Sequence, residues 1–132
     1  MKRKPSWIKS FSHSSEQIGL IRRDLREKNL CTVCTEALCP NLGECWKSRT
    51  ATFMLMGAVC TRGCRFCHVQ TGHPNQILDQ EEPQKIVEQV KKMDLQYVVL
   101  TSVDRDDLSD GGASHFARVI SALYDSCPGI SV

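Results

Sequence analysis

The sequence has no apolar run near the roughly 18 to 20 residues that a membrane-spanning helix needs, which excludes a membrane-spanning chain. Residues 1–20 also lack a secretory signal, because their basic start is followed by polar residues and never by an apolar stretch. We therefore expect a reducing, cytoplasmic location. In that compartment clustered cysteines bind metals more often than they form disulfides.

Aromatic residues are scarce, at 6% of the chain, and the basic amino-terminal arm contains only Trp7 and Phe11. Two aromatic side chains make a poor platform for stacking bases, so we expect no nucleic-acid partner. Lys and Arg outnumber Asp and Glu in residues 1–30, whereas the remainder is net negative. This arm is consistent with an acidic protein partner or with an ordinary solvated surface.

Strands and helices alternate in the second half of the chain. Short apolar runs predict buried strands at residues 51–57 and 96–102, and amphipathic patterns predict helices at 81–93 and 113–126. Residues 130–132 look like the start of a third strand. This alternation indicates an α/β fold with a parallel sheet. Since the third strand has only begun at the last residue, we expect a longer protein that has been cut short.

The first half is less regular. Ser14 or Ser15 can cap a helix that ends near Leu30 and places Ile18, Ile21 and Leu25 on one face. Residues 31–48 show no clear periodicity and contain Pro40 and Gly43 as breakers. We expect metal binding to be what orders this segment.

Eight cysteines are the strongest signal in the 132 residues, and seven of them lie between Cys31 and Cys67. The downstream group, Cys60, Cys64 and Cys67, forms a C-x3-C-x2-C loop directly after the first predicted strand. Three thiolates are one short of a closed zinc site, whereas a [4Fe-4S] cluster held by three cysteines keeps one iron open for a small molecule. The carboxyl end of a parallel strand is also where α/β folds usually bind ligands. A structural zinc site is the alternative.

The upstream group consists of Cys34, Cys39 and Cys45, and it indicates a second soft-metal site, either zinc or another cluster. Cys31 is either an additional ligand or a buried free thiol. Cys127, at the end of the last predicted helix, is expected to be a small packing residue.

An acidic segment at residues 101–112 follows the second predicted strand and ends in Gly111 and Gly112. It could face the cysteine loop and bind the polar part of a ligand, since two glycines allow close backbone approach. The alternative is an acidic turn with a helix cap. His68, His73 and His115 are as consistent with ordinary polar residues as with proton carriers.

The loop from Cys60 to Cys67 (CTRGCRFC) resembles that of radical S-adenosylmethionine (SAM) enzymes. Three further segments, at residues 32–46, 49–57 and 101–117, resemble the lipoyl synthase family within that group. The resemblance implies an amino-terminal extension, residues 1–49, and the first βα units of a partial, TIM-like barrel of six such units, residues 50–132.

The resemblance also implies a reaction, in which two sulfur atoms are inserted at C6 and C8 of a protein-bound octanoyl chain through a 5'-deoxyadenosyl radical made from SAM. It implies two [4Fe-4S] clusters, one on Cys60, Cys64 and Cys67, and an auxiliary one on three further cysteines, Cys34, Cys39 and Cys45. Phe66, Gly111 and Gly112 are the candidates for contacting SAM. The implied partners are an octanoylated lipoyl carrier protein or domain and an electron donor such as flavodoxin or ferredoxin.

The family has a further half that supplies a serine ligand to the auxiliary cluster, and this half is absent from the 132 residues. We therefore expect this chain alone to be inactive or nearly so. Three other interpretations stay open: another radical SAM enzyme with an auxiliary cluster, a zinc- or cluster-binding interaction module, and a fragment that binds the carrier or SAM without chemistry.

Overall fold

The computed structural model describes residues 16–75 and 77–132. Residues 1–15, with Trp7, Phe11 and the expected cap at Ser14 or Ser15, lie outside the described residues. The elements in chain order are α1 (Glu16–Glu27), β1 (Cys31–Thr32), α2 (Val33–Glu36), α3 (Leu42–Lys47), β2 (Thr50–Leu55), β3 (Val59–Cys60), β4 (Gln70–Thr71), α4 (Glu82–Lys92), β5 (Tyr97–Ser102) and α5 (Ala113–Ser126).

A parallel pair of strands, β2 and β5, forms the centre of the molecule. Thr50 lies opposite Tyr97, and the pairing continues to Leu55 opposite Ser102. The short strand β1 pairs antiparallel with the other edge of β2. A parallel bridge joins Tyr97 to Ser131, so the predicted third strand does begin at the end of the chain. The fold is therefore mixed α/β with parallel βα units, as the alternation predicted.

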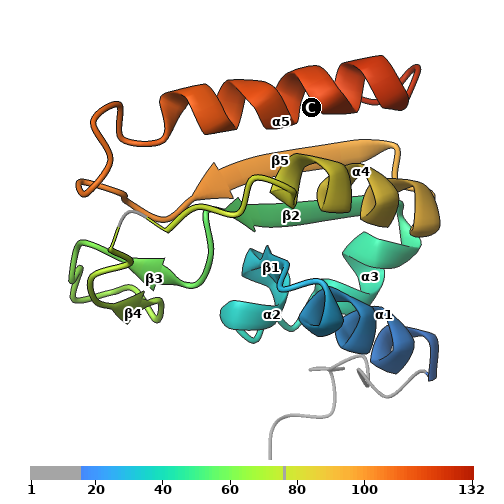
Figure 1. The fold of residues 1–132 in the computed structure, drawn as a ribbon. Helices are drawn as coiled ribbons and strands as arrows, with labels where there is room; N and C mark the ends of the chain where they lie inside the picture. The colour runs from blue at the N-terminus through green and yellow to red at the C-terminus, as the bar shows by residue number, and fades with distance from the viewer. Residues whose placement is uncertain (1–15, 76) are drawn as a thin grey trace, which may run out of the picture.

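The helices that follow the two parallel strands form where the apolar periodicity placed them. α5 has the predicted bounds, and α4 begins and ends within one residue of its predicted bounds. Proline at the first turn of α4 suits a helix start, because its missing N–H has no helical partner there. Ile86 and Val90 of α4 and Val119 and Leu123 of α5 are buried. In Figure 1, α5 lies on one side of the sheet strands and α1 and α2 lie on the other.

The prediction that β5 is a fully buried strand is wrong. Val98 is completely buried, but Tyr97 is 50% exposed and Val99 is 36% exposed. Side chains alternate between the two faces of a strand, so one face of β5 is covered and the other is open to solvent.

The segment 31–48 is also more regular than expected. Thr32 caps α2, because its Oγ1 accepts a hydrogen bond of 3.2 Å from the Thr35 N–H. Leu42 and Trp46 of α3 are buried in the core cluster that includes the side chains of β2. These two helices are too short to produce a detectable period, and Leu42 and Trp46 give α3 apolar contacts with the core.

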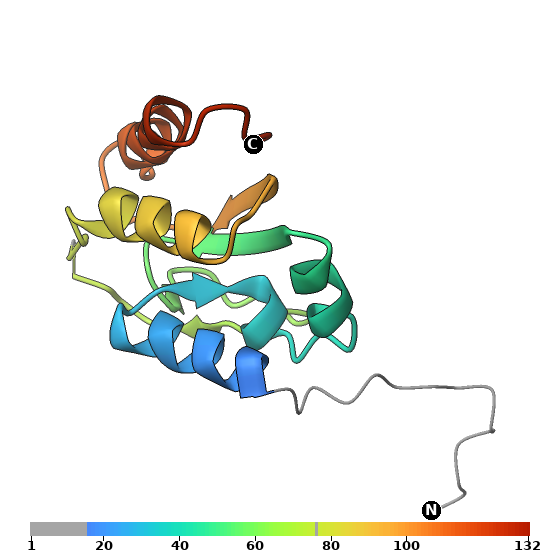
Figure 2. The ribbon, with the colours of Figure 1, turned by 90° about the vertical axis from the view of Figure 1, so that its right-hand side faces the viewer.

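Two ion pairs attach α1 and the residue that follows it to α4. Lys92 Nζ lies 2.7 Å from Asp24 Oδ1, and Lys28 Nζ lies 3.4 Å from Glu88 Oε2. Figure 2 shows α1 running along the same side of the molecule as β1. Among the described helices, none is both long and apolar enough to cross a membrane.

Candidate functional site

The downstream cysteines lie in a loop at the carboxyl ends of the two parallel strands. Both arrowheads, of β2 and β5, point toward this loop, which contains the small parallel pair β3 and β4 (Figure 1). Cys60 is partly buried, whereas Cys64 and Cys67 are exposed, and the Cys67 N–H donates to the Cys64 carbonyl at 3.0 Å. All eight cysteines are free thiols. The predicted place of the loop in the fold is therefore confirmed.

Hydrogen bonds fasten the start of this loop to the acidic segment after β5. The Asp104 N–H lies 3.3 Å from the Cys60 Sγ, and the Thr61 N–H donates to the Asp104 carbonyl at 3.0 Å. The Thr61 hydroxyl donates to Asp106 at 2.8 Å. Arg62 donates to both carboxylate oxygens of Asp106, at 3.0 and 2.9 Å. The acidic segment thus faces the cysteine loop, as expected.

Arg62 and Asp106 each stabilise the charged form of the other. The Arg62 guanidinium, followed by the Thr61 hydroxyl, lowers the pKa of Asp106 below its ordinary value. The same pairing raises the pKa of Arg62, which stays protonated. An ionised carboxylate and a guanidinium form a charge-assisted, two-pronged contact. The Asp106 carboxylate therefore holds the start of the cysteine loop in place, and both of its oxygens already accept hydrogen bonds.

Asp110 caps helix α5. Its two carboxylate oxygens accept from the Gly112 N–H and the Ser114 N–H, each at 2.9 Å. Hydrogen bonds from Ser114 and Gly112 lower the pKa of Asp110 to about 2. The interpretation of the acidic segment as a turn with a helix cap is thus correct for this residue.

A shallow pocket of about 450 Å³ opens at the carboxyl ends of β2 and β5, and its lining includes Met56, Ser102, Gly111 and Gly112. The two glycines predicted to contact SAM therefore share one cavity. Phe66 does not line it; its side chain is 90% exposed on the cysteine loop. The structure thus brings together two of the three residues proposed for this ligand.

The upstream thiols gather around α2 and α3. Cys34 is buried, Cys39 and Cys45 are partly buried, and the Cys39 N–H donates to the Cys34 carbonyl at 3.2 Å. Burial, and then the neighbouring Cys34 and Cys39, raise the pKa of Cys45. Cys45 thus lies near both Cys34 and Cys39. Cys31 is partly buried, and this burial raises its pKa to about 11, which favours the protonated thiol. Cys127 packs partly buried against the core, as expected.

Both cysteine groups offer the type of ligand that iron–sulfur clusters need, because these clusters bind to proteins through thiolate sulfur. Across residues 16–75 and 77–132, no three His, Cys, Asp or Glu side chains converge closely enough to hold one metal ion. A [4Fe-4S] cluster does not require this convergence, since each of its cysteines binds a different iron.

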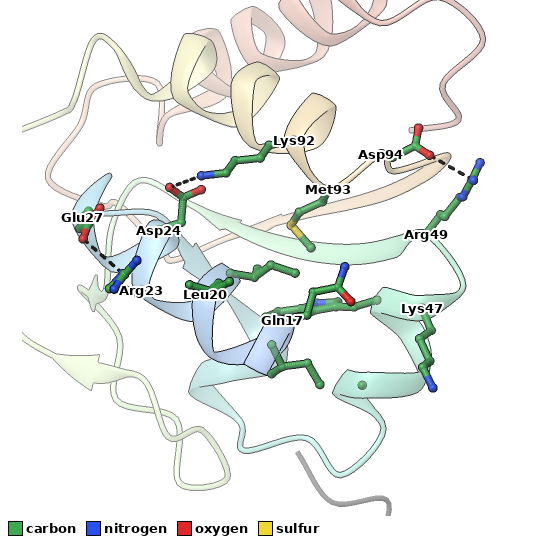
Figure 3. Close-up of a pocket in the computed structure, with 14 residues that line it drawn as sticks. Gln17, Leu20, Arg23, Asp24, Glu27, Lys47, Arg49, Lys92, Met93 and Asp94 are labelled. Atoms are coloured by element: carbon green, nitrogen blue, oxygen red, sulfur yellow. Dashed lines mark hydrogen bonds and ion pairs between the residues drawn. The ribbon is translucent and has the colours of Figure 1, made fainter. Parts of the chain in front are cut away.

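A larger hollow lies elsewhere. It has a volume of about 780 Å³, lies between α1, α3 and the end of α4, and contains no cysteine in its lining (Figure 3). Charged residues at its rim pair with one another, as Arg49 does with Asp94 at 3.1 Å. None of the thiols therefore lines this hollow.

Sequence reasoning missed a buried polar group beside the cysteine loop, formed by Glu82, Arg105 and His115. From the sequence, His115 is as consistent with an ordinary polar residue as with a proton carrier. These side chains come from three separate elements, so no local pattern marks them. The two other histidines noted with it, His68 and His73, are exposed.

Comparison with known proteins gives close relatives. The chain is 50% identical to a lipoyl synthase of Marinobacter nauticus over 132 residues, which is 100% of this chain and 38% of the relative. It is 51% identical to a lipoyl synthase of Thermus thermophilus and 54% identical to one of Francisella philomiragia, in each case over 98% of this chain and 40% of the relative. The chain thus spans about two fifths of the length of these relatives.

A family match covers the region from the end of β2 to the last residue. Residues 54–132, more than half of the chain, match the Radical SAM superfamily. The match includes the cysteine loop, the acidic segment and both helices that follow the parallel strands. The chain therefore belongs to the Radical SAM superfamily.

Proposed function

We propose that this chain is the cluster-bearing part of a lipoyl synthase. The observation that carries the proposal is the three-cysteine loop at the carboxyl ends of a parallel strand pair, fastened there by Asp104 and Asp106. About 50% identity to lipoyl synthases over the whole chain supports it. The proposed division is an extension at residues 1–49 and the first units of a partial βα barrel at residues 50–132.

In this proposal Cys60, Cys64 and Cys67 hold one [4Fe-4S] cluster and the upstream cysteines hold the auxiliary one. When bound, the first cluster would supply the electron that splits SAM to start hydrogen abstraction from the octanoyl chain, and the auxiliary cluster would supply sulfur. The chain's own residues would orient these groups. Exposed Cys64 and Cys67 leave the loop accessible. Gly111, which has open space around it, would leave room for part of SAM in the pocket that Gly112 and Met56 also line.

The proposed substrate is an octanoyl chain carried on a lipoyl carrier protein or domain, and the proposed electron donor is a flavodoxin or ferredoxin. Phe66 is proposed to contact SAM from the loop. A reducing cytoplasm suits the eight free thiols, because thiolate ligands must stay reduced to bind iron.

Anaerobic reconstitution with iron and sulfide tests the cluster assignment. We expect about eight irons for each chain, as two [4Fe-4S] clusters require. Replacing Cys60, Cys64 and Cys67 together with alanine should remove half of the iron, and replacing Cys34, Cys39 and Cys45 should remove the other half. Cys127→Ala is the matched control and should retain all of it. Zinc bound in place of iron would contradict the proposal.

A second assay tests the reaction itself. An octanoylated carrier domain, SAM and a reductant are incubated with a relative of full length in which residues of this chain replace the matching part. We expect lipoyl product to form, and we expect it to be lost when Cys60 or Cys34 is replaced. A chimera that retains both clusters and cleaves SAM, yet leaves the octanoyl chain unchanged, would contradict the assignment as a lipoyl synthase.

A further inference from the structure

The backbone at Met56 has an unusual conformation. Met56 is the first residue after β2 and has a φ of 68°, in the left-handed region that residues other than glycine rarely adopt. Gly57 follows with a φ of 92°. Two successive left-handed residues turn the chain sharply out of the sheet. Cys60 lies only three residues beyond this turn.

Buried charged side chains hold both polar groups of the Met56 backbone. The Met56 N–H lies 3.0 Å from each carboxylate oxygen of Glu82. The Met56 carbonyl accepts from the Arg105 guanidinium at 3.4 Å. Glu82 is 4% exposed and Arg105 is 2% exposed. Charged groups this deeply buried are retained only with full hydrogen bonding, so they fix the Met56 peptide firmly.

His115 orients the Glu82 carboxylate. The His115 Nε2 lies 2.6 Å from Glu82 Oε2, and the His115 side chain is fully buried. The His115 Nδ1 lies 3.1 Å from a nitrogen of Arg118. Arginine can only donate, so Nδ1 accepts and the proton lies on Nε2, which donates to Glu82. The carboxylate is thus held by an imidazole on one side and by the strand exit on the other.

Arg105 connects this buried group to the cysteine loop. Its guanidinium is fixed by two hydrogen bonds of 2.9 Å to Asp107. Its neighbours in sequence, Asp104 and Asp106, point outward and hold the start of the cysteine loop. One short segment therefore fixes the Met56 carbonyl on its inner side and the Cys60 region on its outer side.

We propose that Glu82, oriented by His115, is a positioning residue for the cluster loop. Glu82 is hydrogen-bonded to the Met56 backbone and to His115, and it does not line the pocket at Gly111 and Gly112. It sets the direction in which the chain leaves β2, and this direction determines where Cys60 lies relative to that pocket. The inference rests on the proposed function, because it assumes that Cys60, Cys64 and Cys67 hold the cluster.

The test uses Glu82→Gln with Glu81→Gln as the matched control. Gln keeps the size of Glu82 but replaces one of its two acceptor oxygens with an NH₂ donor. The Met56 N–H and the His115 Nε2–H both donate, so the Gln side chain cannot accept from them as the carboxylate does. Glu81 is the preceding residue, and its side chain is 80% exposed. Both changes are made in a chain whose Cys34, Cys39 and Cys45 are alanine, so that a single cluster contributes to the electron paramagnetic resonance spectrum.

We expect Glu82→Gln to bind as much iron as Glu81→Gln but to give shifted lines in the spectrum of the reduced cluster. The SAM concentration that gives half of the spectral change should rise about tenfold, as expected for losing one hydrogen bond to a buried charged group. In the iron-free chain, amide exchange at Thr61 should also accelerate, because the Met56 peptide that leads into the loop is no longer held in place.

A second pair of variants separates positioning from folding and decides the matter if Glu82→Gln does not fold. His115→Phe removes the donor to Glu82, and His115→Gln supplies a new donor. Phe should reproduce the spectral shift, and Gln should restore the unmodified spectrum and SAM response. Identical behaviour of the two variants would overturn the proposal, as would superimposable spectra for Glu82→Gln and Glu81→Gln.

The failure of this inference is distinguishable from the failure of the proposed function. A starting chain that holds no iron, or whose cluster spectrum does not respond to SAM, overturns both. If the starting chain responds to SAM and the Glu82→Gln and His115→Phe variants respond equally, the positioning role alone is overturned.

Discussion

Arg62 and Asp106, separated by 43 residues in the chain, join the cysteine loop to the segment after β5 through paired hydrogen bonds of 3.0 and 2.9 Å. Both side chains are more than half exposed. An exposed ion pair contributes little to the stability of the whole fold. Its effect should therefore be local and should concern how firmly the loop holds its cysteines.

Arg62→Lys tests this local role. Lysine keeps the charge but cannot form the two-pronged contact with a carboxylate. We expect an almost unchanged free energy of unfolding, while a chelator removes iron from the reconstituted chain roughly two- to fivefold faster, the factor that one exposed charge pair supports. Arg23→Lys, which alters an exposed pair with Glu27 on α1, is the control. Equal rates of iron loss in the two variants would contradict the expectation.

Gly112 is required by its neighbours as well as by its backbone. Its φ is 91°, and a Cβ at this position would overlap the side chain of Met56. We expect Gly112→Ala to destabilise the chain by about 2 to 4 kcal/mol, from backbone strain and overpacking together. Gly111 has a φ of 61° and open space around it, so Gly111→Ala should cost only about 1 to 2 kcal/mol. Urea unfolding measures both, and equal losses would argue against the steric contribution.

The elements that could be predicted from the sequence are those that a local residue pattern specifies. β2, α4 and α5 were predictable because apolar runs and helical spacing are written along consecutive residues. The cysteine loop was predictable because its ligand types and spacing are local too. The close approach at Gly112 was expected to serve a ligand, whereas the nearest group in the structure is the side chain of Met56.

The contacts that position the loop were not predictable in the same way. Glu82 meets the Met56 backbone across 26 residues and His115 across 33. In sequence, Glu82 is an ordinary acidic residue in the first turn of a helix, where an exposed carboxylate is common. Only tertiary packing decides that this carboxylate is buried and that its neighbour Glu81 is not.

The helices of the upstream cysteine segment should persist without metal. Leu42 is completely buried and Trp46 is 7% exposed, so apolar burial alone anchors α3. We expect amide protection at Cys45 and Trp46 in chain that has been treated with a chelator. Leu42→Ala should cost about 2 to 5 kcal/mol and remove that protection, whereas Leu38→Ala, at an 82% exposed side chain, should not. Unprotected amides in the metal-free chain would restore the view that metal binding orders this segment.

The cap at Asp110 should make stability depend on pH in the acidic range. Hydrogen bonds from Ser114 and Gly112 lower the pKa of Asp110 from its ordinary value of 3.8 to about 2 in the folded chain. A carboxyl group with a lowered folded-state pKa stabilises the fold fully above its unfolded pKa, and this contribution is lost as the pH falls toward the folded value. Asp110→Asn cannot ionise and offers one acceptor oxygen in place of two. We therefore expect the thermal midpoint of the unmodified chain to exceed that of Asp110→Asn near neutral pH, and the difference to close as the pH falls from 3.8 to about 2. A difference that stays constant across this range would show that the cap acts through shape alone and not through its charge.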